Sequence, residues 1–283
     1  MAASMREDNS RDQRQGETAA TNEEQAKITE RERLSALTVF HIIRSEGEEE
    51  MDRPAMSLWW SGIAAGLGLS TSLLAQGILH HALGGRPGAE LIEAFGYSLG
   101  FVLVILCRLQ LFTENTLSVV LPVLSQPSVR NFLRAGRLWL IVLVANFVGT
   151  FVTAFIALTI HTAAPEHLAA MLEVSRRAAQ ISGWSAFARA IPAGFYMASI
   201  VWMLPSARGF EFAVIGLFAW LISVGGFSHV VAGSAETFML MLHGELALPT
   251  VFGAYLLPSL VGNIIGGTGL FAVLAYAQIK SEI

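Results

Sequence analysis

One cysteine, Cys107, occurs among 283 residues, and this scarcity excludes an intrachain disulfide and a metal site built from several thiolates. Charged residues make up only 14% of the chain, against 53% hydrophobic residues, and these proportions exclude an ordinary soluble domain. No basic patch with interleaved aromatic residues is present, so we expect no nucleic-acid partner. Because the first residues are polar, we also expect no cleavable signal peptide.

Familiar catalytic motifs are missing as well. The sequence contains no HExxH motif and no cluster of cysteine and histidine residues. We therefore expect neither an enzyme nor a bound metal or cofactor. The Asn-Pro-Ala repeats of a typical aquaporin are also missing, which disfavours a simple water pore.

Long apolar runs dominate what is present, and they predict a multi-pass protein embedded in the lipid bilayer. We expect an all-α membrane protein with six spans and both termini on one side of the membrane. A short basic loop over 126–137 and a surface helix within 162–183 would connect spans. The spans cover about residues 57–83, 91–124, 138–161, 184–204, 210–242 and 249–277.

The charges are concentrated at the N-terminus. Residues 1–53 hold 8 Lys/Arg and 13 Asp/Glu, so we expect a polar tail there, followed by a transmembrane domain over 54–283. Residues 22–44 suit either an amphipathic interfacial helix or a solvated, partly helical tail. Residues 45–53 are expected to be a solvated linker. Because residues 1–50 contain no span, we expect them to be dispensable for folding.

Basic residues in the loops favour cytoplasmic termini. The loops on the side of the termini contain Arg130, Arg134, Arg137, Arg208 and Lys280, against Arg86, Arg176 and Arg177 on the other side. The expected location is therefore a bacterial-type inner membrane. Two GxxxG motifs, at Gly62–Gly66 and Gly262–Gly266, predict close helix packing.

The fifth span contains an unusual stretch, LISVGGFSHVVAGSAETFMLM, at 221–241. Adjacent glycines at Gly225 and Gly226 favour a break in the helix. His229 then lies beside that break, near the bilayer midplane. An ionisable side chain there costs free energy and indicates a functional site more readily than a packing kink with a buried histidine.

A similar interruption occurs in the second span. Phe112-Thr113-Glu114 matches Phe227-Ser228-His229 in residue type, and the two triplets are 115 positions apart. Paired interrupted helices in two halves of a membrane protein are typical of a transport site.

Free N–H groups at the start of each half-helix suit a small anion. Thr113 and Ser228 add hydroxyl donors, and His229 can donate a proton or a hydrogen bond. A bare anion crossing an apolar constriction would meet a large desolvation penalty, whereas its neutral acid would meet far less. The pattern therefore predicts entry of an anion together with a proton.

Three motifs resemble the formate/nitrite transporter family over roughly residues 57–280. They are LFTEN in the second span, GFSHVVAG in the fifth and GNIIGG in the sixth. The resemblance implies an aquaporin-like 3+3 inverted repeat with broken helices in spans 2 and 5. It also implies a homopentamer with one pore per protomer for small monovalent anions. The pore histidine would be His229, the loop pair Phe112-Thr113, and the constriction Tyr97, Phe101 and Ile222.

The sequence departs from well-known members at several positions. Glu114, Arg108 and Arg189 add charges, and Ser228 replaces a glutamate that is common in formate channels. Glu114 either pairs with one of the two arginines, as a buried charge requires, or acts directly in selectivity. Two alternatives to an anion channel also stay open, namely a pore for water or neutral solutes and a membrane scaffold without flux.

Overall fold

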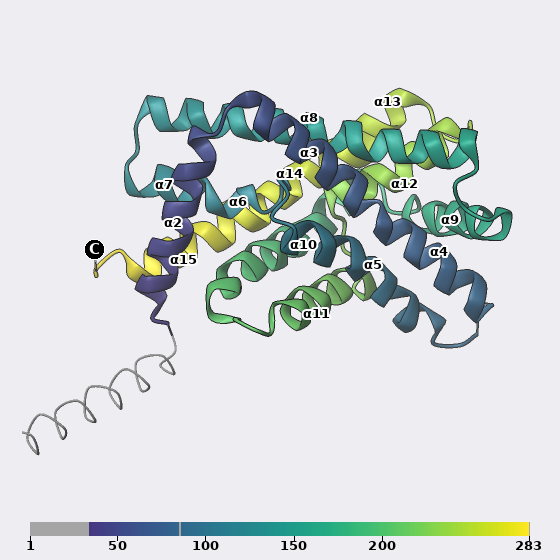
Figure 1. The fold of residues 1–283 in the computed structure, drawn as a ribbon, viewed down its shortest axis with the longest axis horizontal. Helices are drawn as coiled ribbons and strands as arrows, with labels where there is room; N and C mark the ends of the chain where they lie inside the picture. Colours follow the sequence, from purple (N-terminus) through teal and green to yellow (C-terminus); the bar gives the residue numbers. More distant parts are fainter. Residues whose placement is uncertain (1–33, 85, 283) are drawn as a thin grey trace, which may run out of the picture. The chain divides into compact units, whose positions relative to one another are not determined.

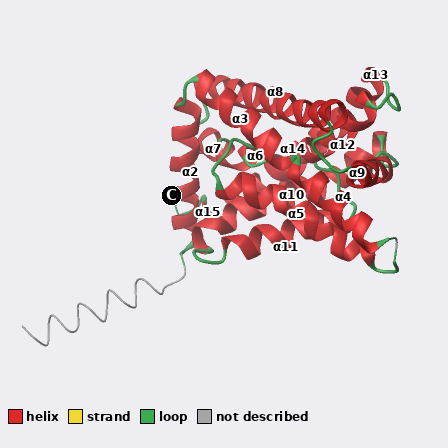
Figure 2. Cartoon of the chain, turned by 45° about the vertical axis from the view of Figure 1, so that its right-hand side comes forward, coloured by secondary structure: helices red, strands yellow, loops and turns green. Residues whose placement is uncertain are grey.

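The computed structural model describes residues 34–84 and 86–282, and one compact unit begins at Ala36. All regular secondary structure in these described residues is helical (Figure 1, Figure 2). The helices are α2 (Ala36–Asp52), α3 (Ala55–Leu69), α4 (Thr71–Leu83), α5 (Ala89–Leu106), α6 (Asn115–Ser118), α7 (Val120–Ser125), α8 (Val129–Ile160), α9 (Pro165–Ala178), α10 (Gly183–Met203), η1 (Leu204–Ser206), α11 (Glu211–Val224), α12 (Val230–Leu242), α13 (Leu248–Thr250), η2 (Val251–Leu256), α14 (Leu257–Ile264), η3 (Ile265–Ala272) and α15 (Val273–Ile279).

Within residues 34–84 and 86–282, five helical segments are long and apolar enough to cross a membrane. They are Ala55–Leu83, Ala89–Leu106, Val129–Ile160, Gly183–Ser206 and Leu248–Ile279. Three shorter apolar helices accompany them, Asn115–Ser125, Glu211–Val224 and Val230–Leu242. The short helices follow or flank the two interruptions expected from the sequence, because α5 ends before residue 107 and α11 ends before residue 225.

Glycines let two pairs of helices touch backbone to backbone, as the GxxxG motifs predict. A Cβ atom on Gly66 of α3 would lie 2.2 Å from the Asn146 carbonyl oxygen of α8. A Cβ atom on Gly266 of η3 would lie 1.9 Å from the Ile191 carbonyl oxygen of α10. Any side chain at either glycine would therefore force the paired helices apart.

The structure corrects one connection and confirms another. Residues 129–137, expected as part of a basic loop, form the first turns of the 32-residue helix α8. Ser128 caps this helix by accepting a hydrogen bond from the Asn131 backbone N–H, so the basic residues extend the helix beyond its apolar part. The expected surface helix is present as α9, and Pro165 occupies its first turn.

The linker expected at 45–53 is wrong, because α2 continues through it to Asp52. The earlier part of the expected helix, residues 22–33, lies outside the described residues. On α2, Phe40, Ile43 and Met51 are buried. A Cβ atom on Gly47 would lie 2.0 Å from the Ser118 carbonyl oxygen of α6. In the acidic run Glu49 is exposed, but α2 itself is packed against the rest of the fold, so removal of residues 36–50 is expected to destabilise it.

The carboxyl group of Glu50 joins α2 to the first break. Gln110 Nε2 and Ser118 Oγ donate to it at 3.1 and 3.0 Å. Burial raises the pKa of Glu50 above its usual value, and these two donors oppose the shift. Glu50 thus links α2 to the first break and to α6 through hydrogen bonds.

We expect Glu50→Gln to flatten the pH dependence of stability. A raised carboxyl pKa contributes stability that is complete below the unfolded value of about 4.3 and is lost as the pH rises through the folded value. The melting temperature of the parent should therefore fall as the pH rises above about 4.3, and that of Glu50→Gln should fall less. Thermal unfolding in detergent at several pH values measures this, with Glu49→Gln on the exposed face as the control. If the melting temperatures of the parent and of Glu50→Gln decreased equally with pH, the prediction would be contradicted.

Candidate functional site

One buried asparagine on α8 stabilises the non-helical backbone of the first break, residues 107–114. The Asn146 side-chain oxygen accepts from the Phe112 backbone N–H at 2.9 Å. Its amide nitrogen donates to the carbonyl oxygens of Gly62, at 2.9 Å, and Gln110, at 2.8 Å. Backbone groups freed by the break would otherwise lack partners inside a membrane. Asn146 therefore fixes the conformation of the break and ties it to α3.

The second break, residues 225–229, has the same arrangement around Asn263 of α14. The Asn263 side-chain oxygen accepts from the Val230 N–H at 2.8 Å. Its amide nitrogen donates to the carbonyl oxygens of Ala190 and Ser228, both at 2.9 Å. Each break thus has one asparagine that accepts one N–H and donates to two carbonyls.

This correspondence adds a second alignment of the breaks. The asparagine bonds match Phe112 with Val230, 118 positions later, whereas the sequence triplets pair Phe112 with Phe227. Both registers are present, because the triplets end directly before α6 and α12, whose first residues are 115 positions apart, and the asparagine bonds match residues 118 positions apart. The reason is loop length, because the first break contains eight non-helical residues, 107–114, and the second contains five, 225–229.

The two breaks meet through Thr113 and His229. Thr113 Oγ1 lies 2.7 Å from His229 Nε2, and both residues are buried. His229 also caps α12, because its Nδ1 accepts from the Ala232 N–H at 3.2 Å. Since Nδ1 is an acceptor, the neutral ring carries its proton on Nε2 and donates it to Thr113 Oγ1. Both ring nitrogens are therefore occupied by the protein itself.

Aromatic rings lie beside this contact. The ring centroids of Phe101 and His229 are 4.9 Å apart, with the rings edge-on to each other. The ring centroids of Tyr97 and Phe101 are 5.0 Å apart. Ile222 is buried in the same hydrophobic cluster. The ring of Phe112 instead packs edge-on against Trp139 of α8, at 5.6 Å. The structure therefore brings Tyr97, Phe101, Thr113 and His229 together, and Phe112 contributes packing and its backbone N–H.

The expected charge network of Glu114, Arg108 and Arg189 does not form. Arg108, at a φ of 53° just after α5, points away and pairs with Glu46 of α2 at 3.1 Å. Arg189 donates to the Gly226 carbonyl oxygen at 3.4 Å and accepts from the Ser228 N–H at 3.2 Å through its own carbonyl. Within the described residues, Glu114 has no ion pair, and its buried Oε1 has no hydrogen-bond partner.

Two cavities lie beside the segments that contain Thr113 and His229. The α9-side cavity, of about 360 Å³, is lined by Ser228 and His229 and reaches α4, α5 and α9. The α2-side cavity, of about 610 Å³, is lined by Gln110 and Glu114, which flank the Thr113 loop. The cavities share no lining residue. The Thr113–His229 contact therefore joins a residue that lines the first cavity to the neighbour of a residue that lines the second.

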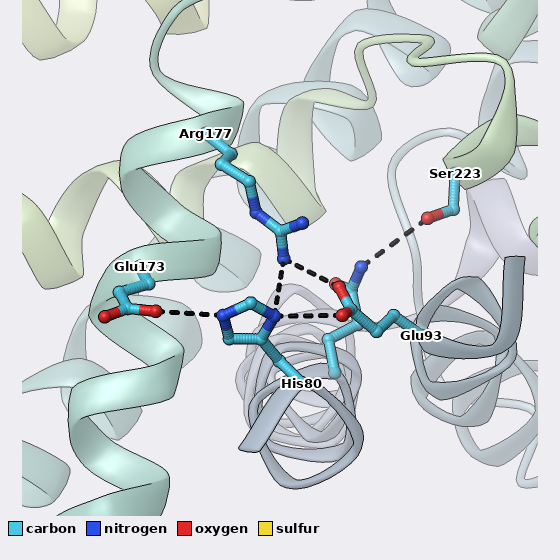
Figure 3. A network of polar contacts seen from close by, with 6 residues as sticks. His80, Glu93, Glu173, Arg177 and Ser223 are labelled. Atoms are coloured by element: carbon cyan, nitrogen blue, oxygen red, sulfur yellow. Dashed lines mark hydrogen bonds and ion pairs between the residues drawn. The ribbon is translucent and has the colours of Figure 1, made fainter. Parts of the chain in front are cut away.

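Sequence reasoning missed a polar network at the α9-side cavity (Figure 3). His80 of α4 lies between Glu93 of α5 and Glu173 of α9, with each carboxylate oxygen 2.9 Å from a ring nitrogen. Arg177 of α9 donates to Glu93 at 2.7 Å. The network joins the consecutive helices α4 and α5 to α9, which is distant in sequence, so no local pattern predicts the whole network.

Glu236 was missed as well, although a signal was available. It follows His229 by seven residues on α12 and lines the α9-side cavity. A carboxyl group inside an apolar membrane helix indicates function by default.

Interruptions between apolar helices that contact each other beside cavities are typical of membrane channels and transporters rather than enzymes. The family model for the formate/nitrite transporter matches residues 37–277. The chain belongs to the formate/nitrite transporter family and is a multi-pass membrane protein.

Individual relatives agree with this assignment. The chain is 40% identical to the inner membrane protein YfdC of Escherichia coli over 248 residues, which cover 88% of this chain and 80% of YfdC. Among solved structures, it resembles a pentameric formate channel with formate bound, at a TM-score of 0.68 and 20% identity, covering 80% of this chain and 98% of that one. It also resembles an FNT family ion channel, at a TM-score of 0.71 and 16% identity, covering 85% and 98%. These structural matches support the fold.

Proposed function

We propose that this protein is a proton-linked channel or transporter for small monovalent anions that form weak acids, such as formate and nitrite. The observation that carries the proposal is the Thr113–His229 contact, at 2.7 Å, between two helix breaks that lie beside two cavities. A permeating acid would replace Thr113 as the partner of His229 Nε2 and pass between the cavities. Family membership supports transport of this class of solute.

We further propose a six-span topology arranged as a 3+3 inverted repeat. α5 with α6 and α7 would be the broken second span, and α11 with α12 the broken fifth. The matching bonds of Asn146 and Asn263 support the repeat. Residues 54–283 would form the transport domain, with 1–53 on the cytoplasmic side of an inner membrane.

The assembly proposed is a homopentamer in which every protomer has its own pore. The pentameric formate channel supports this by similarity of fold. In each pore, Tyr97, Phe101 and Ile222 would form the apolar constriction beside His229. Ser228 would present its hydroxyl on the α9 side, and Glu114 on the α2 side, both as cavity-lining residues. Phe112 would hold the first break in place through Trp139.

The test is uptake into proteoliposomes that contain a lumenal pH dye. Formate and nitrite uptake should rise as the external pH falls from about 8 to 5, because more neutral acid forms at the entrance. Each anion that enters as its acid should release a proton inside and acidify the lumen. Protein-free liposomes give the background, since neutral acids also cross lipid.

Other outcomes would favour the alternatives. Carboxyl groups outnumber cationic side chains in the linings of both cavities. Ionised carboxyl groups would repel an anion but not a neutral solute, and this supports the neutral-solute pore. Uptake of glycerol or urea without any anion uptake would establish that alternative. No flux of any solute above background would leave a membrane scaffold and would overturn the transport proposal.

A further inference from the structure

The helix face below His229 forms one wall of the α9-side cavity. His229, Gly233 and Glu236 all line it, and they are spaced i, i+4 and i+7. Seven residues are close to two helical turns, so Glu236 lies on the same face as His229 and about 10 Å along the axis. A Cβ atom on Gly233 would meet nothing within 4 Å. Open space therefore connects the carboxyl group of Glu236 with the imidazole of His229.

Glu236 has no hydrogen bond or ion pair within the described residues, and in this it differs from its neighbour Glu93. Glu93 binds Arg177 at 2.7 Å and His80 at 2.9 Å. Of the described residues lining the cavity, Arg177 is the only one with a permanent positive charge, and it is committed to Glu93. Nothing in the lining therefore neutralises an ionised Glu236.

His229 is poorly arranged to supply a proton itself. Its Nδ1 accepts from the Ala232 N–H and its Nε2 faces Thr113 Oγ1. A second proton on this ring would break the cap of α12, because a protonated Nδ1 cannot accept the Ala232 N–H. The histidine is thus a hydrogen-bond donor to the passing solute, and another group must change the solute's protonation state.

The groups that face Glu236 leave it as the suitable donor. Glu90 lies exposed in the first turn of α5, at the edge of the lining, and Glu93 is paired. Phenols lose protons only near pH 10 and do not donate to a weak-acid anion at neutral pH. The titratable or charged residues lining the cavity, besides Glu236, are Glu90, Glu93, Tyr97, Arg177, His229 and Tyr255.

We infer that Glu236 protonates the entering weak-acid anion in the α9-side cavity, before the solute reaches His229. This inference rests on the proposed function and adds the group that makes the neutral acid. The O–H bond of the Glu236 carboxylic acid breaks as an O–H bond forms on the anion, which becomes the neutral acid. The resulting Glu236 carboxylate takes its next proton from the solution on the α9 side. The neutral acid then passes Phe101 and His229.

The test compares the pH dependence of formate uptake in the parent and in Glu236→Gln. Without a proton donor in the cavity, uptake should follow the neutral formic acid in solution, which falls about tenfold per pH unit above the acid's pKa. The parent should fall less steeply. The two proteins should therefore agree near pH 5 and differ on the order of 100-fold near pH 8, a size that general acid catalysis reaches.

Matched variants separate this role from a structural one. Glu90→Gln removes a carboxyl from the same lining and should keep the parent slope. Glu236→Asp keeps a carboxyl and should restore a shallow slope, and Glu236→Ala replaces Glu236→Gln if the latter does not assemble. Equal slopes in the parent and in the variant that lacks the carboxyl would overturn the inference while leaving the proposed function in place. A parent protein without formate or nitrite uptake would overturn both.

Discussion

Replacing Asn263 with leucine should prevent recovery of a folded protein. The Asn263 side chain satisfies the Val230 N–H and the carbonyl oxygens of Ala190 and Ser228. Leucine would leave these three groups without partners, at about 1–3 kcal/mol each, or about 3–9 kcal/mol together. This loss is comparable with the whole stability of a typical domain, about 5–15 kcal/mol. Size-exclusion chromatography of the solubilised protein, followed by thermal unfolding, measures the effect.

Related variants test the reason for this loss. Asn146→Leu should be equally damaging, because Asn146 makes the equivalent three bonds at the first break. Asn263→Asp should be equally damaging, because it keeps the acceptor for the Val230 N–H but buries a charge and turns a carboxylate oxygen toward the carbonyl oxygens of Ala190 and Ser228. Asn131→Leu is the control, since the Asn131 side chain donates to Gln126 in an exposed position where water can replace it. A melting temperature of Asn263→Leu close to that of Asn131→Leu would show that the break does not depend on its asparagine.

The sequence is informative wherever the physics is local. Gly225 caps α11 and Gly226 adopts a φ of +61°, a conformation that glycine tolerates, so the second break is predictable from the pair. Gly66 and Gly266 lie at backbone contacts for the same kind of reason, because only a missing side chain permits them. The contact between Thr113 and His229 agrees with the sequence analysis, which treats the interruptions of the second and fifth spans as a pair.

What the sequence does not supply depends on contacts between distant segments. Asn146 and Asn263 lie inside helices without a local signal, and their role appears only when the breaks pack against them. Glu50 lies in an acidic run that looks solvated, yet one side of that helix is buried against α6 and α7. An arginine partner is expected for Glu114 because buried charges usually have one, but Arg108 bonds to α2 instead.

The difference between the two registers has a similar origin. Matching Glu114 with His229 treats residue type as the guide, although side chains in loops of unequal length need not correspond. The bonds of the two asparagines to the Phe112 and Val230 N–H groups give the other register, because backbone groups freed by a helix break must be satisfied in both halves. Short triplets and backbone partners therefore identify different equivalent positions in such repeats.

Substitution of His229 should have the largest effect on transport. His229→Phe removes the Nε2–H donor and adds an apolar ring beside Phe101, whose ring lies 4.9 Å from that of His229. A neutral acid crossing this point would lose a hydrogen bond without compensation, which costs about 1–3 kcal/mol and corresponds to about a 5- to 150-fold slower flux. Formate uptake into proteoliposomes with a lumenal pH dye measures this loss.

His229→Asn should separate the cap of α12 from the contact with Thr113. Asparagine is among the best N-cap residues, so it can accept the Ala232 N–H that His229 Nδ1 accepts now. Its side chain is shorter than that of histidine and is expected to lose the contact with Thr113 Oγ1, now 2.7 Å from His229 Nε2. The variant should therefore keep its melting temperature but admit the hydrated anion, and fewer protons should enter with each formate. Thr113→Ala should give the same change from the other side, and the double variant should add little, because both substitutions remove one contact. Unchanged flux, pH profile and proton stoichiometry in His229→Asn would make His229 a packing residue and remove it from the proposed pathway.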